Sequence, residues 1–140
     1  MTESRAGFSV LVPRLLIGII FIAHGAQKLF GWFGGHGLEE TGKWMASIGL
    51  QPGVLMAIIS GGAEFFGGLF ILMGLFTRLG AFLLIATMIV AIFTVHLHNG
   101  LFASHGGYEF NLALIAACIS LAYSGAGRLS ADAYIRKKPR

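Results

Sequence analysis

The sequence predicts an all-α integral membrane protein: an antiparallel bundle of four transmembrane helices with a short interfacial helix in the first outer loop. Three observations predict this fold class. The chain of 140 residues is 56% hydrophobic. Only 11% of it is charged, against about 25% in soluble domains. Four apolar segments follow one another at lengths near the roughly 20 residues that a helix needs to cross a bilayer. We therefore expect a single transmembrane domain.

The four predicted spans divide the chain in order. They cover about 10–30, 54–76, 79–97 and 108–126, and a basic tail, 127–140, follows them. The first three are long enough to cross a bilayer without help. The fourth reaches that length only if it begins near Tyr108 and continues to about Gly127.

The first outer loop, about Gly31–Pro52, is too long for a tight turn. Leu38, Met45 and Ile48 recur in it at helical spacing, and Glu39 and Glu40 would occupy the first turn. This pattern predicts a short amphipathic helix that lies at the membrane surface.

The basic residues set the predicted orientation. If the N-terminus is cytoplasmic, the outer side holds only Lys28 and Lys43. The inner side then holds the other eight basic residues: Arg5, Arg14, Arg78, Arg128, Arg136, Lys137, Lys138 and Arg140. By the positive-inside rule, both termini are predicted to be cytoplasmic, with the chain in a bacterial inner membrane.

Charge and cysteine content exclude two classes of function. The isoelectric point near 9.6 is basic, but the basic residues are dispersed around the spans rather than gathered in a patch, so we expect no nucleic-acid partner. The single cysteine, Cys118, lies in an apolar segment. It can form no disulfide within the chain and belongs to no Cys-x-x-Cys motif, which argues against thiol–disulfide exchange.

Ionisable residues inside the spans mark the candidate site. Glu64 lies about 15 Å into the second span, at 1.5 Å per residue. A charge at the bilayer centre costs about 2.5–3.5 kcal/mol on insertion scales, so it usually faces a partner or a cavity. His24, Gln27 and Lys28 share one helical face, at spacings i, i+3 and i+4. By depth, we expect His24 to lie near Glu64 and Lys28 to lie closer to the outer surface.

Other polar residues converge from the same side. All five histidines fall in the outer half or the outer loops: His24, His36, His96, His98 and His105. Thr94 and His98 share a face of the third span, and Asn111 opens the fourth. We therefore expect an outward-facing cavity, with His24 and Glu64 as candidate catalytic residues. Its candidate ligand-binding residues are Gln27, Lys28, Thr94, His98 and Asn111.

Three interpretations of this site stay open. It could bind a ligand or conduct protons, or Glu64 could pair with His24 or Lys28 only to fix helix register. A metal or haem site is the least favoured, because His96 and His98 point opposite ways on a helix and lack the spacing of a zinc helix. No metal ligand is assigned. A haem held by histidines of two spans stays open beside a quinone.

Several short motifs resemble a known family. They are Arg14-Leu15 with Gly18, Gly25-x-x-Lys28-Leu29, Gly62-x-Glu64-x-x-Gly67-Gly68, Leu75-x-Thr77-Arg78, and Gly125-x-Gly127-x-Leu129-Ser130-x-Asp132. In order and spacing they resemble the DoxX family of small four-span membrane proteins. The resemblance implies a quinone-linked redox role or a place in a membrane complex, without naming a substrate.

The leading expectation is a DoxX-like inner-membrane protein that binds a quinone or a similar apolar redox molecule as part of an oxidoreductase system. His24 and Glu64 would handle protons, and Gln27 and Lys28 would polarise a carbonyl oxygen. The alternative is a non-catalytic anchor or scaffold subunit of a redox or stress-response complex. The expected partners are the lipid bilayer and an oxidoreductase subunit, and a homo-oligomer stays open. Small size and the lack of an inverted repeat argue against a transporter.

Overall fold

The computed structural model describes residues 3–127 and 129–137, with side chains from 9–127 and 129–136. Its helices are α1 (Glu3–Phe30), α2 (Gly37–Ser47), α3 (Gly53–Met73), α4 (Thr77–Ala91), α5 (Glu109–Ser124) and α6 (Ala131–Lys137). Short helical turns, Ile92–His96, Leu97–Asn99 and Ala103–His105, connect α4 to α5. The described residues contain no strand, so the all-α prediction is confirmed.

Within the described residues, three helical segments are long and apolar enough to cross a membrane: Ser9–Phe30, Gly53–Met73 and Thr77–Asn99. The fourth, α5, is apolar but has only 16 residues. The predicted interfacial helix in the first outer loop is present as α2, with two glutamates in its first turn. The helix α6 lies inside the predicted basic tail and was not predicted. Arg128 and residues 138–140 of that tail lie outside the described residues.

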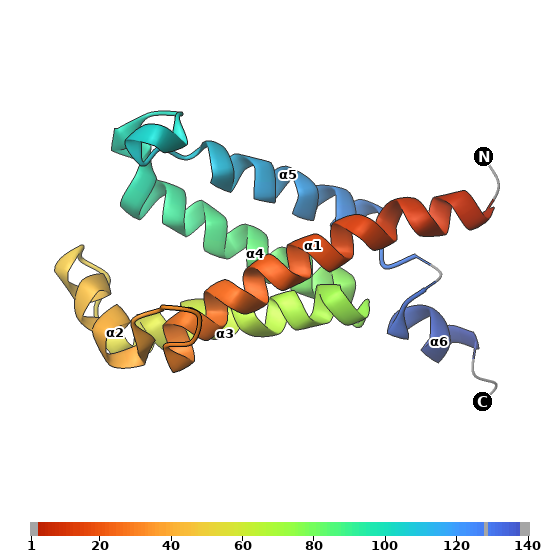
Figure 1. The fold of residues 1–140 in the computed structure, drawn as a ribbon, viewed down its shortest axis with the longest axis horizontal. Coiled ribbons are helices and arrows are strands. Elements are labelled where there is room, and N and C mark those ends of the chain that lie inside the picture. Colours follow the sequence, from red (N-terminus) through yellow and green to blue (C-terminus); the bar gives the residue numbers. More distant parts are fainter. Residues whose placement is uncertain (1–2, 128, 138–140) are drawn as a thin grey trace.

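The long helices lie side by side in the order α1, α3, α4, α5 (Figure 1). Contact is most extensive between α1 and α3, and α1 touches α5 only slightly. The start of α1 and the helix α6 lie at one end of the bundle, which we call the terminal end. The helix α2 and the turns before α5 lie at the other, which we call the loop end (Figure 1).

Glycines allow α1 and α3 to approach each other closely. A Cβ atom built on Gly25 would lie 2.5 Å from the backbone nitrogen of Phe65, and one on Gly68 would lie 2.8 Å from that of Ile22. Close backbone contact of this kind supplies packing energy where lipid gives helices no hydrophobic drive to associate. It also brings the polar faces of the two helices together.

The packed core occupies the middle of the bundle and its terminal end. It consists of buried side chains from all four long helices: Ile17, Phe21, Ile71, Ala81, Leu84, Met88, Leu114, Cys118 and Leu121. Nearer the loop end, the helices enclose a cavity instead.

Arg14 closes the terminal end of the bundle. Its side chain is 2% exposed, and its guanidinium donates four hydrogen bonds of 2.7–3.1 Å to backbone carbonyls. Two of the acceptors, Ile71 and Leu72, lie in the last turn of α3, where the Ile71 carbonyl also accepts from the backbone N–H of Gly74. The other two, Ala126 and Leu129, lie in the segment after α5. Arg14 thus joins the first helix, the third helix and the C-terminal segment.

Candidate functional site

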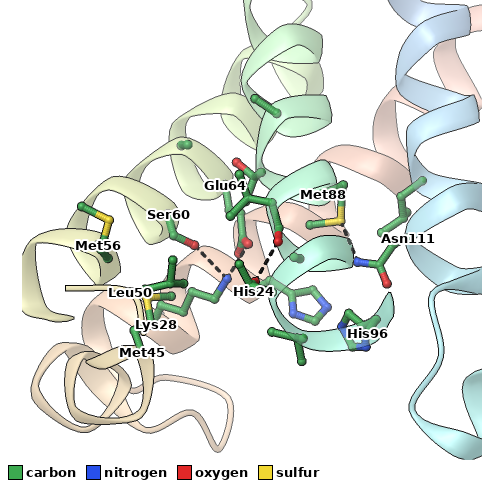
Figure 2. Close-up of a pocket in the computed structure, with 18 of the residues that line it drawn as sticks. His24, Lys28, Met45, Leu50, Met56, Ser60, Glu64, Met88, His96 and Asn111 are labelled. Atoms are coloured by element: carbon green, nitrogen blue, oxygen red, sulfur yellow. Dashed lines mark hydrogen bonds and ion pairs between the residues drawn. The ribbon is translucent and has the colours of Figure 1, made fainter. Parts of the chain in front are cut away.

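A cavity of about 710 Å³ opens at the loop end of the bundle (Figure 2). Side chains of α1, α3, α4 and α5 form its walls, and α2 and the turns before α5 border it. Most lining residues are apolar, among them Phe21, Met45, Ile59, Val90 and Leu114. This size and character match those of small-molecule sites, which enclose about 300–1,000 Å³ and carry few polar groups.

The main polar feature of the cavity is an ion pair between α1 and α3. The Nζ atom of Lys28 lies 2.5 Å from Oε1 of Glu64 and also donates a hydrogen bond to the Ser60 hydroxyl at 3.2 Å. The Glu64 side chain is 2% exposed and that of Lys28 is 26% exposed. The second carboxyl oxygen, Oε2 of Glu64, is buried and has no hydrogen-bond partner. The protein therefore leaves part of the hydrogen-bonding capacity of the Glu64 carboxyl group unfilled.

The direction of side chains on a helix explains why Lys28, rather than His24, meets Glu64. Every Cα–Cβ bond in a helix tilts toward the helix N-terminus. The helices α1 and α3 run in opposite directions (Figure 1). The Lys28 side chain therefore tilts toward the terminal end, and the Glu64 side chain tilts toward the loop end. A Cβ built on Gly61, about one turn before Glu64, would lie 3.1 Å from the Cβ of Lys28, so the two side chains meet across a difference of about one turn.

Three further predicted site residues also line the cavity, namely His24, Thr94 and Asn111. Asn111 is 7% exposed and its amide nitrogen lies 3.4 Å from the Met88 sulfur, which is a weak acceptor. The Thr94 hydroxyl donates to the carbonyl of Val90, in its own helix, at 2.7 Å. His24 is exposed, and its ring projects into the space between the helices (Figure 2).

The other two predicted ligand-binding residues do not line the cavity. Gln27 donates a hydrogen bond from its side-chain amide to the carbonyl of Phe33 at 3.2 Å. It thereby holds the loop after α1, where Phe33 has a left-handed backbone conformation. His98 is exposed in the helical turn Leu97–Asn99.

His96 lines the cavity instead of His98. Its Nδ1 atom lies 2.7 Å from the carbonyl oxygen of Gly106, in the loop before α5. His96 belongs to a π-helical turn, Ile92–His96, which re-aims the side chains at the end of α4. The sequence analysis named His98, not His96, as a candidate ligand-binding residue, and a regular helix would place the two on opposite sides.

The cavity offers hydrogen-bond and proton chemistry in an apolar space. Lys28 and Asn111 can donate hydrogen bonds, Glu64 can accept one, and His24 and His96 can do either. Within the described chain, no group of three or more His, Cys, Asp or Glu side chains is arranged to hold a metal ion.

Comparison with known proteins identifies the class of protein that this fold and site define. The DoxX family model matches residues 9–97. The chain belongs to the DoxX family of membrane proteins, and the resemblance found in the sequence is confirmed.

Several relatives match over most of their length. The chain is 35% identical to "Putative oxidoreductase CatD" of Bacillus subtilis, over 91% of this chain and 87% of that protein. It is 31% identical to "Inner membrane protein YqjF" of Escherichia coli, over 92% and 93%. It is 29% identical to "Inner membrane protein YphA" of the same organism, over 88% and 87%. No solved structure matches the chain.

Proposed function

We propose that this protein binds a quinone, or a similar apolar redox molecule, in the cavity at its loop end and serves a membrane oxidoreductase system. One observation carries the proposal: an ion pair with a buried, unfilled carboxyl oxygen lies in a mostly apolar cavity. A quinone headgroup is an apolar ring that carries carbonyl oxygens, so both parts of it find complementary surroundings here. The name of the Bacillus subtilis relative points toward redox chemistry as well.

The proposed roles follow from the geometry. The Lys28 ammonium has three hydrogens, of which two point to Glu64 and Ser60. Its third hydrogen can donate to a carbonyl oxygen of the ligand. Glu64 and His24 are the groups that can exchange protons with the reduced ligand. Asn111, on the opposite wall, can orient the ring.

A quinone becomes a quinol by taking up two electrons and two protons. The side chains described above supply protons and orientation. The electrons would come from a partner oxidoreductase with a flavin or metal carrier. The alternative role, a subunit of a membrane complex, also requires such a partner. A scaffold without ligand binding would instead use the Lys28–Glu64 pair only to hold α1 against α3.

Tryptophan fluorescence provides a direct test. The chain has two tryptophans; Trp44 lines the cavity and Trp32 does not. The variant Trp32→Phe keeps Trp44 as the only reporter, and Trp44→Phe is its matched control. Titration of a short-chain ubiquinone into purified protein in detergent should quench the first variant with saturation and leave the second nearly unchanged. Equal, unsaturable quenching of both variants would contradict binding in this cavity.

Two further measurements separate the alternatives. Solvent extraction of the purified protein should recover quinone, whereas a Soret band in its visible spectrum would indicate haem. Glu64→Gln keeps the shape of the side chain, so in the binding role it should alter quinone affinity more than stability. In the scaffold role it should lower the melting temperature, and no quinone should bind to the parent protein.

A further inference from the structure

We infer that the cavity binds the reduced, hydroxyl-bearing form of its ligand, a quinol, more tightly than the oxidised quinone. This inference rests on the proposed function and names which redox form the site recognises. Its starting point is the Oε2 atom of Glu64. Among the buried side-chain nitrogen and oxygen atoms in the described part of the chain, this oxygen is the one without a hydrogen-bond partner.

The free oxygen is a hydrogen-bond acceptor. Lys28 donates to the other oxygen of the same carboxyl group, and a neighbouring ammonium favours the ionised form of a carboxyl group. An ionised carboxylate can only accept hydrogen bonds. A buried charged acceptor without a donor is more costly than a neutral one, so the site is completed by a ligand that brings an O–H or N–H group.

Two hydroxyl groups that line the cavity are bonded to their own helical segments. The Thr87 hydroxyl donates to the carbonyl of Leu83 at 2.8 Å. The Thr94 hydroxyl donates to Val90 in the same manner. Both threonines line the cavity, yet each is bonded to its own helix, so neither of these hydroxyls serves the Glu64 carboxylate.

A single phenolic hydroxyl satisfies both halves of the ion pair. Its oxygen can accept the remaining hydrogen of Lys28, and its hydrogen can be donated to Glu64. The carboxyl group can turn to present either oxygen, because the terminal torsion of a glutamate side chain is soft. A quinone carbonyl can accept from Lys28 but has no hydrogen to donate, so it leaves the carboxylate unfilled. The difference between the two redox forms is one hydrogen bond to a charged group.

Binding of the two forms can be compared directly. Ubiquinone-1 and ubiquinol-1 are titrated into the purified protein under nitrogen by calorimetry, and the quinol is also used to displace the quinone from the Trp44 reporter. The quinol should bind at least about tenfold more tightly, as a hydrogen bond to a charged group is worth about one factor of ten or more. In Glu64→Gln, whose amide can donate as well as accept, the ratio should fall below about threefold.

Two variants control for folding and charge. Glu40→Gln makes the same substitution on the exposed face of α2 and should keep the wild-type ratio. If Glu64→Gln does not fold, the double variant Lys28→Gln with Glu64→Gln removes both charges together, and it should also lose the preference for quinol.

The outcomes distinguish this inference from the function on which it rests. Equal affinity for the two forms, or tighter binding of the quinone, would overturn the inference and leave quinone binding intact. If neither form binds to the wild-type protein, the proposed function fails and the inference fails with it.

Discussion

The carboxylate of Asp132 accepts hydrogen bonds from both the backbone N–H and the hydroxyl of Thr77, at 3.3 Å and 3.4 Å. It also accepts from the backbone N–H of Phe76 at 3.0 Å. These groups form the start of α4, where backbone N–H groups have no partner within the helix. A residue from the C-terminal segment therefore caps a helix that begins 55 positions earlier in the chain.

Asp132→Ala should lower the free energy of unfolding by about 1 kcal/mol, within the range of 0.5–2 kcal/mol for a lost N-terminal cap. Asp132→Asn should lose less, because an asparagine oxygen also accepts from helical N–H groups. Thermal melting in detergent would measure both. Equal loss in the two variants would show that the charge of Asp132, rather than its capping bonds, matters.

Arg14→Gln should be far more damaging than Arg78→Gln. Arg14 is buried and serves four carbonyls, whereas Arg78 is exposed and donates from Nε to the carbonyl of Ala122. Each buried carbonyl left without a donor costs about 1–3 kcal/mol, so Arg14→Gln should reduce the yield of folded protein sharply. Similar melting temperatures for the two variants would contradict the closing role of Arg14.

The Lys28–Glu64 pair should behave as a coupled unit. Lys28→Met leaves a carboxylate buried without its cation, which costs about 3–5 kcal/mol in a buried pair. The double variant Lys28→Met with Glu64→Leu should recover most of this stability, and a double-mutant cycle of melting measurements would give the coupling free energy. Additive losses in the cycle would show that the two side chains do not interact in the membrane.

Gly25→Ala and Gly62→Ala form a matched pair on the two closely packed helices. A Cβ on Gly25 would clash with the backbone of Phe65, whereas one on Gly62 meets nothing within 4 Å. Gly25→Ala should therefore separate α1 from α3 and destabilise the protein. Gly62→Ala should be neutral or stabilising by up to about 1 kcal/mol through helix propensity. Melting curves of both variants test this, and a stable Gly25→Ala would refute the close contact.

The predicted orientation is tested by reporter fusions. Fusions after Arg78 and at the C-terminus should report a cytoplasmic location, and fusions near His36 and His105 should report an external one. An external C-terminus would place the cavity at the cytoplasmic face and reverse the direction from which its protons come.

Hydropathy was sufficient to predict the long apolar helices because a bilayer demands long apolar segments whatever their packing. It was also sufficient to mark Glu64 and Lys28, since a charge inside a span needs a partner. Depth counted along the chain predicted His24 as that partner, because it ignores the tilt and length of side chains. The relation of Gln27 to the cavity depends on the loop after α1, which has no periodic pattern.

Arg14 illustrates a different limit. In the sequence analysis it counts, together with Arg78, only as one of the inner positive charges. Its partners are backbone carbonyls, which every residue has, so no pairing of side chains could identify them. Its position within an apolar segment was the available signal, by the same reasoning that identified Glu64.

The packed core has a consequence for the movement of ligands and protons through this protein. It fills the bundle between the cavity and the end that Arg14 closes. Within the described chain, the cavity therefore does not continue through the bundle to the terminal end. If the proposed ligand turns over in the cavity, its protons are taken up and released at the loop end, because the packed core of described residues offers them no path of titratable side chains toward the terminal end.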